Sequence, residues 1–167
     1  TVYHAPHYTL PFGLKARRVV NVHDIIHVRF PEYFSALRRA YARTMIGHAC
    51  SASDAVIVGS AFAKDELVRT FSIDEHKVHI INDGVSSRFR PGRDAEQSAR
   101  FREKYTIHER YILYVGSLKP HKNAQVLLKA FGRLRGVGRL QLVFVGEELK
   151  GSPNLLALAR KERIHGR

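Results

Sequence analysis

The chain has 167 residues, of which 28 are Lys or Arg and 15 are Asp or Glu, so its formal net charge is +13. Apolar residues make up 44% and charged residues 26%, which is typical of a globular protein and excludes a disordered or collagen-like chain. The apolar runs are as long as strands, and none approaches the ~20 residues of a transmembrane helix. A single cysteine excludes an internal disulfide framework and favours a reducing compartment. The first residues carry neither an initiator Met nor a secretory pattern, so we expect an internal piece of a longer chain.

The positive charge alone leaves nucleic acid, phosphorylated small molecules and an anionic membrane surface open as partners. The arginines of the chain are spread over three segments and are not gathered in a tail. These segments carry Arg38, Arg39 and Arg43, then Arg88, Arg90 and Arg93, then Arg133, Arg135 and Arg139. No zinc-finger spacing, RNP-type aromatic strand or basic-zipper pattern accompanies them. A solvated basic surface explains the charge equally well.

Short β-branched runs alternate with helical patterns in the first half of the chain. Strands are expected at residues 18–22, 55–58 and 78–81, where Val and Ile dominate. Helices are expected at residues 35–50 and 60–71, with Ser35 and Ser60 as their N-caps. The first helix is expected to bury a face of residues spaced by four. That face carries Leu37, Tyr41, Met45 and Ala49.

Residues 86–97 are rich in Arg, Ser, Pro and Gly and lack a period, which predicts a linker. After a short helix at 101–105 the alternation restarts, with strands at 111–115 and 140–145 and helices at 123–134 and 154–161. Asn123 is the expected N-cap of the helix at 123–134. The buried stripe of that helix is expected to consist of Leu127, Ala130, Phe131 and Leu134. The alternation predicts an α/β protein with two parallel sheets in βαβ units, joined by the linker.

Three of the expected strands end in a glycine: Gly59, Gly116 and Gly146. Glycine lets the backbone turn sharply and lets a ligand approach it closely. In doubly wound sheets the carboxyl edge of the strands is where ligands bind. The alternative is that these glycines only ease the turns from strand to helix.

The turn between the strand at 111–115 and the next helix is the most informative segment. Lys119, His121 and Lys122 gather there in front of a helix N-terminus, whose free N–H groups and dipole favour an anion. The pattern therefore predicts a phosphate site, although no Walker string is present. A solvated basic turn is the alternative.

Histidines form the second feature. His4 and His7 flank Pro6, and His23 and Asp24 end the strand at 18–22 with His27 close by. A histidine at the end of a strand can act as an acid, a base or a donor to a sugar hydroxyl. Metal binding is the alternative for the two close pairs, but no Cys or His-x-x-x-His helix supports it. No Gly-x-Ser-x-Gly elbow is present, and the lone cysteine is expected to be packed.

Several segments together resemble the family 4 (group 1) retaining glycosyltransferases of GT-B fold, with the closest likeness to mannosyltransferase-like bacterial members. The likeness covers nearly the whole chain. The segments are residues 4–8 (HAPHY), 22–27 (VHDIIH), 30–32 (FPE), 53–67 (SDAVIVGSAFAKDEL), 81–85 (INDGV) with Phe89 and Pro91, and 115–123 (VGSLKPHKN).

This resemblance implies parts of two Rossmann-like α/β domains with parallel sheets. Residues 1–85 would be the C-terminal part of the acceptor-side domain, 86–100 the interdomain linker, and 101–167 the beginning of the nucleotide-sugar-binding domain. The implied activity is transfer of a hexose, with mannose as the candidate, from a nucleotide-sugar donor to a glycan or lipid-linked acceptor with retention. The resemblance implies no cofactor, no metal and no nucleic-acid partner. The implied location is the cytoplasm, with peripheral contact at the inner face of an anionic membrane.

The resemblance also implies the site residues. His4, His23 and Asp24 are the catalytic candidates, with His4 favoured over His7 as the histidine that follows the preceding strand. Gly116, Ser117, Lys119 and Lys122 are the candidates for binding the donor phosphates. Ser117 stands where the family often has a basic residue, and Lys119 is the candidate substitute.

The family's paired glutamates and N-terminal glycine-rich loop have no counterpart in this sequence. We therefore expect the chain alone to have little or no transfer activity. Uncovered sheet edges lead us to expect self-association as well. A non-catalytic nucleotide- or phosphate-binding module is the alternative function.

Overall fold

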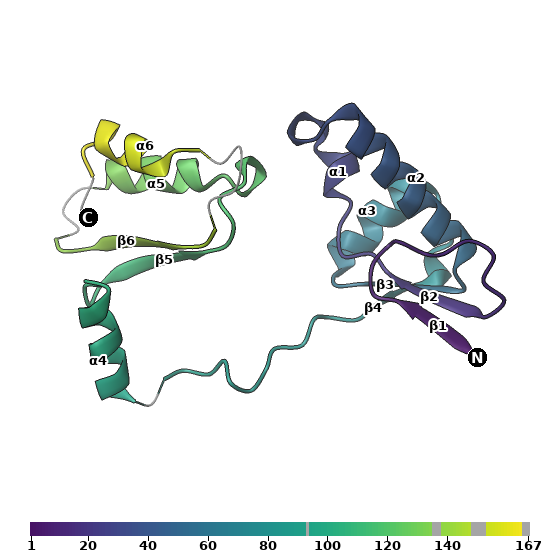
Figure 1. Cartoon of the computed structure of the whole chain (residues 1–167), viewed down its shortest axis with the longest axis horizontal. Coiled ribbons are helices and arrows are strands. Elements are labelled where there is room, and N and C mark those ends of the chain that lie inside the picture. The colour runs from purple at the N-terminus through teal and green to yellow at the C-terminus, as the bar shows by residue number, and fades with distance from the viewer. Residues whose placement is uncertain (93, 135–137, 148–152, 165–167) are drawn as a thin grey trace. The chain divides into compact units, whose positions relative to one another are not determined.

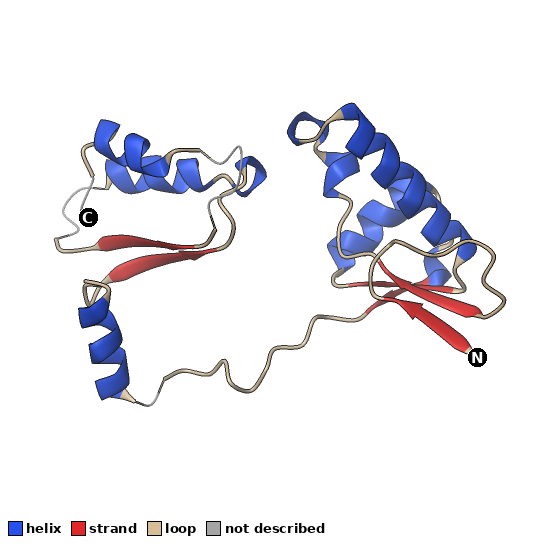
Figure 2. Cartoon of the chain, viewed as in Figure 1, coloured by secondary structure: helices blue, strands red, loops and turns tan. Residues whose placement is uncertain are grey.

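The computed structural model describes residues 1–92, 94–134, 138–147 and 153–164 and forms two compact units, Thr1–Arg88 and Phe89–Arg167. In each unit parallel strands are covered by helices (Figures 1 and 2). The predicted α/β class with parallel sheets is therefore confirmed. The division between the units falls within the segment 86–100 that the sequence predicts as a linker.

The first unit contains a four-stranded parallel sheet in the order β1-β2-β3-β4. Its strands are β1 (Val2–Ala5), β2 (Arg17–Asn21), β3 (Ala55–Val58) and β4 (Val78–Ile80). Its helices are α1 (Ile26–Arg29), α2 (Ala36–Ala52) and α3 (Ala61–Phe71), with 3-10 turns at Pro31–Tyr33 and Glu75–Lys77. The β-branched pattern of the sequence does not predict β1, because its four residues carry no run of β-branched side chains.

The predicted helix caps in this unit are confirmed. The Ser35 hydroxyl accepts from the Arg38 amide at 3.4 Å, and the Ser60 hydroxyl accepts from the Ala63 amide at 3.1 Å. Each hydroxyl satisfies an amide that has no partner within its helix.

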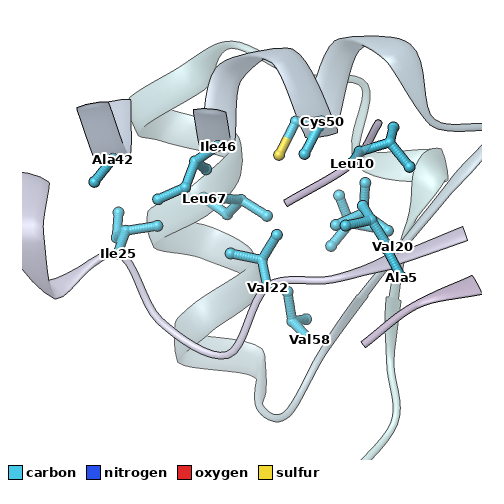
Figure 3. Packing of buried hydrophobic residues seen from close by; sticks show 13 residues of the cluster. Ala5, Leu10, Val20, Val22, Ile25, Ala42, Ile46, Cys50, Val58 and Leu67 are labelled. Atoms are coloured by element: carbon cyan, nitrogen blue, oxygen red, sulfur yellow. The ribbon is translucent and has the colours of Figure 1, made fainter. Parts of the chain in front are cut away.

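The core of the first unit lies between the sheet and α2 and α3 (Figure 3). Alternate strand residues point into it, as the two-residue period of a strand requires. The buried strand residues are Ala5, Val20, Val56, Val58 and Val78, to which α2 adds Ala42, Ile46, Ala49 and Cys50, and α3 adds Leu67.

The predicted buried face of α2 is wrong at its N-terminal end, where Leu37 is 81% exposed and Tyr41 54% exposed. Ala42 and Ile46 are buried in their place, whereas Ala49 is buried as expected. A strict spacing of four residues drifts by about 40° around the helix at each step, since each residue turns by about 100°. The stripe that faces a flat sheet therefore alternates steps of three and four.

The second unit contains two parallel strands, β5 (Tyr111–Val115) and β6 (Gln141–Val145). Helices α5 (Ala124–Arg133) and α6 (Leu155–Lys161) cover one face of this pair, around the buried residues Leu128, Phe131 and Ile164. In α5 the prediction holds for Phe131 but is wrong for Ala130 and Leu134, which are exposed. The other face of β5 carries Tyr111, Leu113 and Val115, all exposed.

Helix α4 (Ala95–Lys104) is longer than the helix predicted at 101–105 and begins inside the segment expected as a linker. The Asp94 side chain caps it by accepting from the Gln97 amide at 2.8 Å. Glu96 and Arg100 form an ion pair one turn apart. Caps and charge pairs stabilise a helix without leaving an apolar period in the sequence.

Replacing Ile46 by Ala should lower the free energy of unfolding of the first unit by about 2–5 kcal/mol, because Ile46 is fully buried. Leu37→Ala is the matched control on the same helix and should change it by less than about 0.5 kcal/mol. Urea unfolding followed on NMR amide signals of the first unit measures both. Equal losses in the two variants would contradict the orientation of α2.

The Asp54 carboxylate accepts from the Arg18 amide and from the Arg17 guanidinium, each at 2.8 Å. These interactions hold the pKa of Asp54 below its ordinary value. A depressed pKa in the folded state stabilises the fold above the unfolded pKa of about 4, and this stabilisation is lost as the pH falls through the folded pKa.

Asp54→Asn should therefore lower the urea midpoint of the first unit at pH 7. The difference in midpoint between the native protein and the variant should shrink progressively below about pH 4. Asp65→Asn, at an exposed position on α3, is the control and should show no such trend. A difference between native protein and Asp54→Asn that does not change with pH would show that the carboxylate is not the source of the stabilisation.

Candidate functional site

In the first unit the loops that follow β1 and β2 meet at the carboxyl edge of the sheet. The ring Nε2 of His23 donates to the carbonyl oxygen of Pro6 at 3.1 Å. One carboxylate oxygen of Asp24 accepts from the Ile26 amide at 3.0 Å and fixes the turn that leads into α1. Two of the predicted catalytic residues thus lie side by side at the edge where ligands bind in such sheets.

Tyr8 belongs to the same neighbourhood, although sequence reasoning did not single it out. Burial raises the pKa of the Tyr8 hydroxyl, and the nearby Tyr41 and Asp24 raise it further. Its ring also lies 3.9 Å from that of His7, between centroids. The only signal in the sequence is its place at the end of the HAPHY segment.

His4 lies within β1 and is not joined to His23 or Asp24. Its Nε2 donates to the side-chain oxygen of Asn21 at 2.8 Å. Because Ala5 points into the core, the strand period places His4 on the opposite face of the sheet. The histidine that follows this strand is His7, whose Nδ1 lies 3.2 Å from the Thr9 hydroxyl.

In the second unit, two strand-end glycines approach each other closely. Gly116 has a φ of +150°, a value that L side chains rarely adopt, and its amide donates to the Val145 carbonyl at 2.9 Å. A Cβ at Gly146 would overlap the carbonyl oxygen of Gly116. The amide of Leu118 then donates to the Glu147 carbonyl at 3.2 Å. Both positions therefore require glycine for the turn to begin as it does.

The turn continues as a 3-10 turn at Pro120–Lys122, and α5 begins at Ala124. The prediction that Asn123 caps α5 with its side chain is wrong: Asn123 has a left-handed backbone, with φ +53° and ψ +36°, and its side chain makes no capping hydrogen bond. Asn123 instead closes the preceding 3-10 turn, its amide donating to the Pro120 carbonyl at 3.0 Å, and Asn adopts a left-handed backbone more readily than most residues.

The four predicted phosphate-binding residues, Gly116, Ser117, Lys119 and Lys122, lie together in this one turn. The Tyr114 hydroxyl donates to the Ser117 carbonyl at 3.0 Å, and this bond holds the first part of the turn. Both lysines are exposed and form no ion pair with an acidic residue in the part of the chain that the structure describes. Two cations beside a helix N-terminus favour an anion.

Among the described residues, no three or more His, Cys, Asp or Glu side chains are grouped so that they could hold a metal ion. Within the same residues, no helix has both the length and the apolar character needed to cross a membrane.

Family models and curated relatives identify the group to which this sequence is similar. Residues 1–89 match the family described as Glycosyltransferase Family 4, and residues 97–165 match Glycosyl transferases group 1. The O-antigen chain mannosyltransferase B of Escherichia coli is 28% identical over 130 residues, which are 78% of this chain and 34% of the relative. The O-antigen chain mannosyltransferase RfbU of Salmonella typhimurium is 27% identical over 123 residues, 74% of this chain and 30% of the relative. The chain thus spans about a third of the length of these relatives.

Solved structures show the same fold. Anabaena Alr3699/HepE in complex with UDP-glucose matches 92% of this chain and 41% of its own, with a TM-score of 0.69 and 18% identity. A glycosyltransferase from Rickettsia africae matches 99% of this chain and 44% of its own, with a TM-score of 0.65 and 16% identity. Together with the family models, these likenesses confirm the resemblance seen in the sequence: the chain belongs to glycosyltransferase family 4, group 1, and has the GT-B fold.

Proposed function

We propose that the protein transfers a hexose from a nucleotide-sugar donor to a glycan or lipid-linked acceptor, with retention and without a metal. The observation that carries the proposal is the turn from Gly116 to Lys122, which sets two exposed lysines beside the start of α5. The O-antigen mannosyltransferase relatives support mannose as the hexose and a glycan as the acceptor. The UDP-glucose named for the Anabaena structure supports a nucleotide-sugar donor.

In this proposal the turn stabilises the departing nucleoside diphosphate. Negative charge develops on the diphosphate as the sugar leaves, and fixed cations and amide groups lower the energy of that charge. Gly116 presents backbone without a side chain at the end of β5, so a phosphate can approach it closely, whereas at Gly146 the missing side chain makes room for the Gly116 carbonyl. Lys122 supplies the principal positive charge, and Lys119 takes the part of the basic residue that Ser117 replaces.

The first unit supplies the groups proposed to meet the sugars. Pro6 offers His23 only a carbonyl acceptor, so Nε2 carries a proton, and in the tautomer with its only proton there Nδ1 accepts from a sugar hydroxyl. Asp24 uses one oxygen on the Ile26 amide, which leaves the other for a second hydroxyl. His4 stays in the proposal as a prediction, with its Nε2 occupied by Asn21.

The proposal also includes a location in the cytoplasm, at the inner face of an anionic membrane. The exposed Arg38 and Arg39 at the beginning of α2 support it, since each such cation near an anionic surface contributes about 1 kcal/mol. Self-association of this chain is proposed through the uncovered face of β5, where Leu113 is 50% and Val115 71% exposed.

Calorimetric titration of the chain with GDP, UDP and dTDP tests the diphosphate site. One of the three should bind, and the Lys122→Ala variant should lose at least about tenfold in affinity, because a hydrogen bond to a charged group is worth about 1.5–3 kcal/mol. Lys129→Ala is the matched control, since Lys129 is an exposed lysine on α5, the helix that follows the turn.

Two outcomes would contradict the role of this turn. Binding that is unchanged in Lys122→Ala would place the diphosphate elsewhere. An equal loss in Lys122→Ala and Lys129→Ala would show that only the net charge of the second unit matters.

A further inference from the structure

The side chain of Tyr114 links strand β5 to the turn that carries the proposed diphosphate site. Its half-buried ring lies on the same face of the sheet as Ile112, which packs against the core of the second unit. The ring also packs on Phe144, its neighbour in the register of β6, with 5.3 Å between ring centroids. Packing therefore holds the ring in place, and its hydroxyl meets the turn from a rigid strand.

The Tyr114 hydroxyl reaches past the end of its own strand. It donates to the Ser117 carbonyl at 3.0 Å, and a Cβ added at Gly116 would lie 3.6 Å from it. On the other side of the same peptide, the Leu118 amide donates to the Glu147 carbonyl at 3.2 Å. The peptide between Ser117 and Leu118 is thus held at both of its polar groups, by a side chain of β5 and by the backbone that follows β6.

The peptide that precedes Ser117 is fixed as well. The Gly116 amide donates to the Val145 carbonyl at 2.9 Å, and the Gly116 carbonyl occupies the space that a Cβ at Gly146 would fill. Because the N–H and C=O groups of a trans peptide point in opposite directions, the Ser117 amide points away from Gly146. Within the described part of the chain, this amide makes no hydrogen bond. The turn therefore holds one backbone donor in a fixed direction and leaves it for a ligand.

An anion is the ligand that this turn favours. Backbone N–H groups held in a fixed direction bind phosphate oxygens, and cations nearby add to the attraction. Lys119 and Lys122, both exposed, supply such cations on the same turn. A peptide carbonyl oxygen has the opposite effect, since its partial negative charge repels an anion. The Tyr114 hydroxyl engages the Ser117 oxygen within the fold, so this oxygen does not oppose a bound phosphate.

We propose that Tyr114 is a positioning residue for the donor diphosphate: its hydroxyl holds the Ser117 carbonyl within the fold, and the Ser117 amide, fixed in this way, donates to a phosphate oxygen. The inference rests on the proposed glycosyl transfer and deepens it, since it adds to the two lysines a backbone donor and the side chain that orients it. Tyr114 itself does not contact the donor and acts through Ser117.

The first measurement needs no ligand. Tyr114→Phe removes only the hydroxyl and keeps the ring on Phe144. Exchange of the Leu118 amide with solvent, followed by NMR, should become about threefold to tenfold faster, because its peptide loses one hydrogen bond. Tyr111→Phe is the matched control, since it removes a hydroxyl from the exposed face of the same strand and should leave this exchange unchanged. Unchanged exchange in Tyr114→Phe would overturn the positioning role.

The second measurement is calorimetric titration with inorganic pyrophosphate and with GDP, UDP and dTDP. Tyr114→Phe should weaken pyrophosphate binding about threefold to tenfold, because a turn that is less often in its binding geometry binds correspondingly less well. Tyr111→Phe should leave the affinity unchanged. The urea midpoint of the second unit separates positioning from stability. A lower midpoint in Tyr114→Phe with unchanged affinity would show that the hydroxyl has only a structural role.

The third measurement follows the Ser117 amide itself. Its proton signal should move downfield as pyrophosphate saturates the chain, because the amide then donates to a charged oxygen. Ser117→Ala removes the hydroxyl and retains the amide, so it should bind pyrophosphate with unchanged affinity. A Ser117 amide signal that stays in place, or a loss in Ser117→Ala as large as that in Lys122→Ala, would overturn the assignment of this amide as the donor.

The Lys122→Ala variant separates this inference from the proposed function. If Lys122→Ala loses affinity and Tyr114→Phe does not, the diphosphate site stands and only the role of Tyr114 is refuted. If Tyr114→Phe loses affinity and Lys122→Ala does not, the turn binds the anion through its backbone and the proposed role of Lys122 is refuted. If neither pyrophosphate nor any of the three nucleoside diphosphates binds the native chain, both proposals are refuted.

Discussion

Parallel pairing of the strands is the constraint on which both candidate sites depend. Because every strand in a sheet runs the same way, every loop that leaves a strand begins at the same edge. The pairing continues past the strand ends, where the Val22 amide donates to the Ile57 carbonyl and the Ile81 amide to the Val58 carbonyl, each at 2.9 Å. The loops therefore start from fixed points, and the residues that follow the strands are brought together without contacts of their own.

Side chains then tie these loops to one another. His23 bonds to Pro6, and the Asn82 amide donates to the Gly59 carbonyl at 2.9 Å, so each bond joins the loops after two neighbouring strands. Both bonds lie at the exposed edge of the sheet, so they join the loops to each other at a place that a ligand can reach. The hydrogen bond from His23 Nε2 to the Pro6 carbonyl also selects the tautomer of His23. The same contact therefore holds the loop and determines which ring nitrogen carries the proton.

Features with a local physical cause could be predicted from the sequence. The serine caps of α2 and α3 and the limits of β5 depend on a few neighbouring residues, and the structure has them as expected. The apolar period of the sequence does not predict strand β1, because β1 is formed by pairing with β2. It predicts helix α4 too short, because an ion pair, and not an apolar period, stabilises the first turns of α4. The placement of His4 could not be predicted, because its face of the sheet is defined only once β1 is known to be a strand.

Helix α2 shows why an apolar period is an incomplete guide to the core. Leu37 and Tyr41 continue the apolar stripe of α2, yet both are exposed. An apolar stripe on a helix indicates that apolar neighbours lie along that side of the helix. Those neighbours can be a ligand as well as a sheet. Tyr41 is 54% exposed whereas the next residue, Ala42, is buried, so the position of the sheet, and not the apolar spacing alone, decides which face of α2 is in the core.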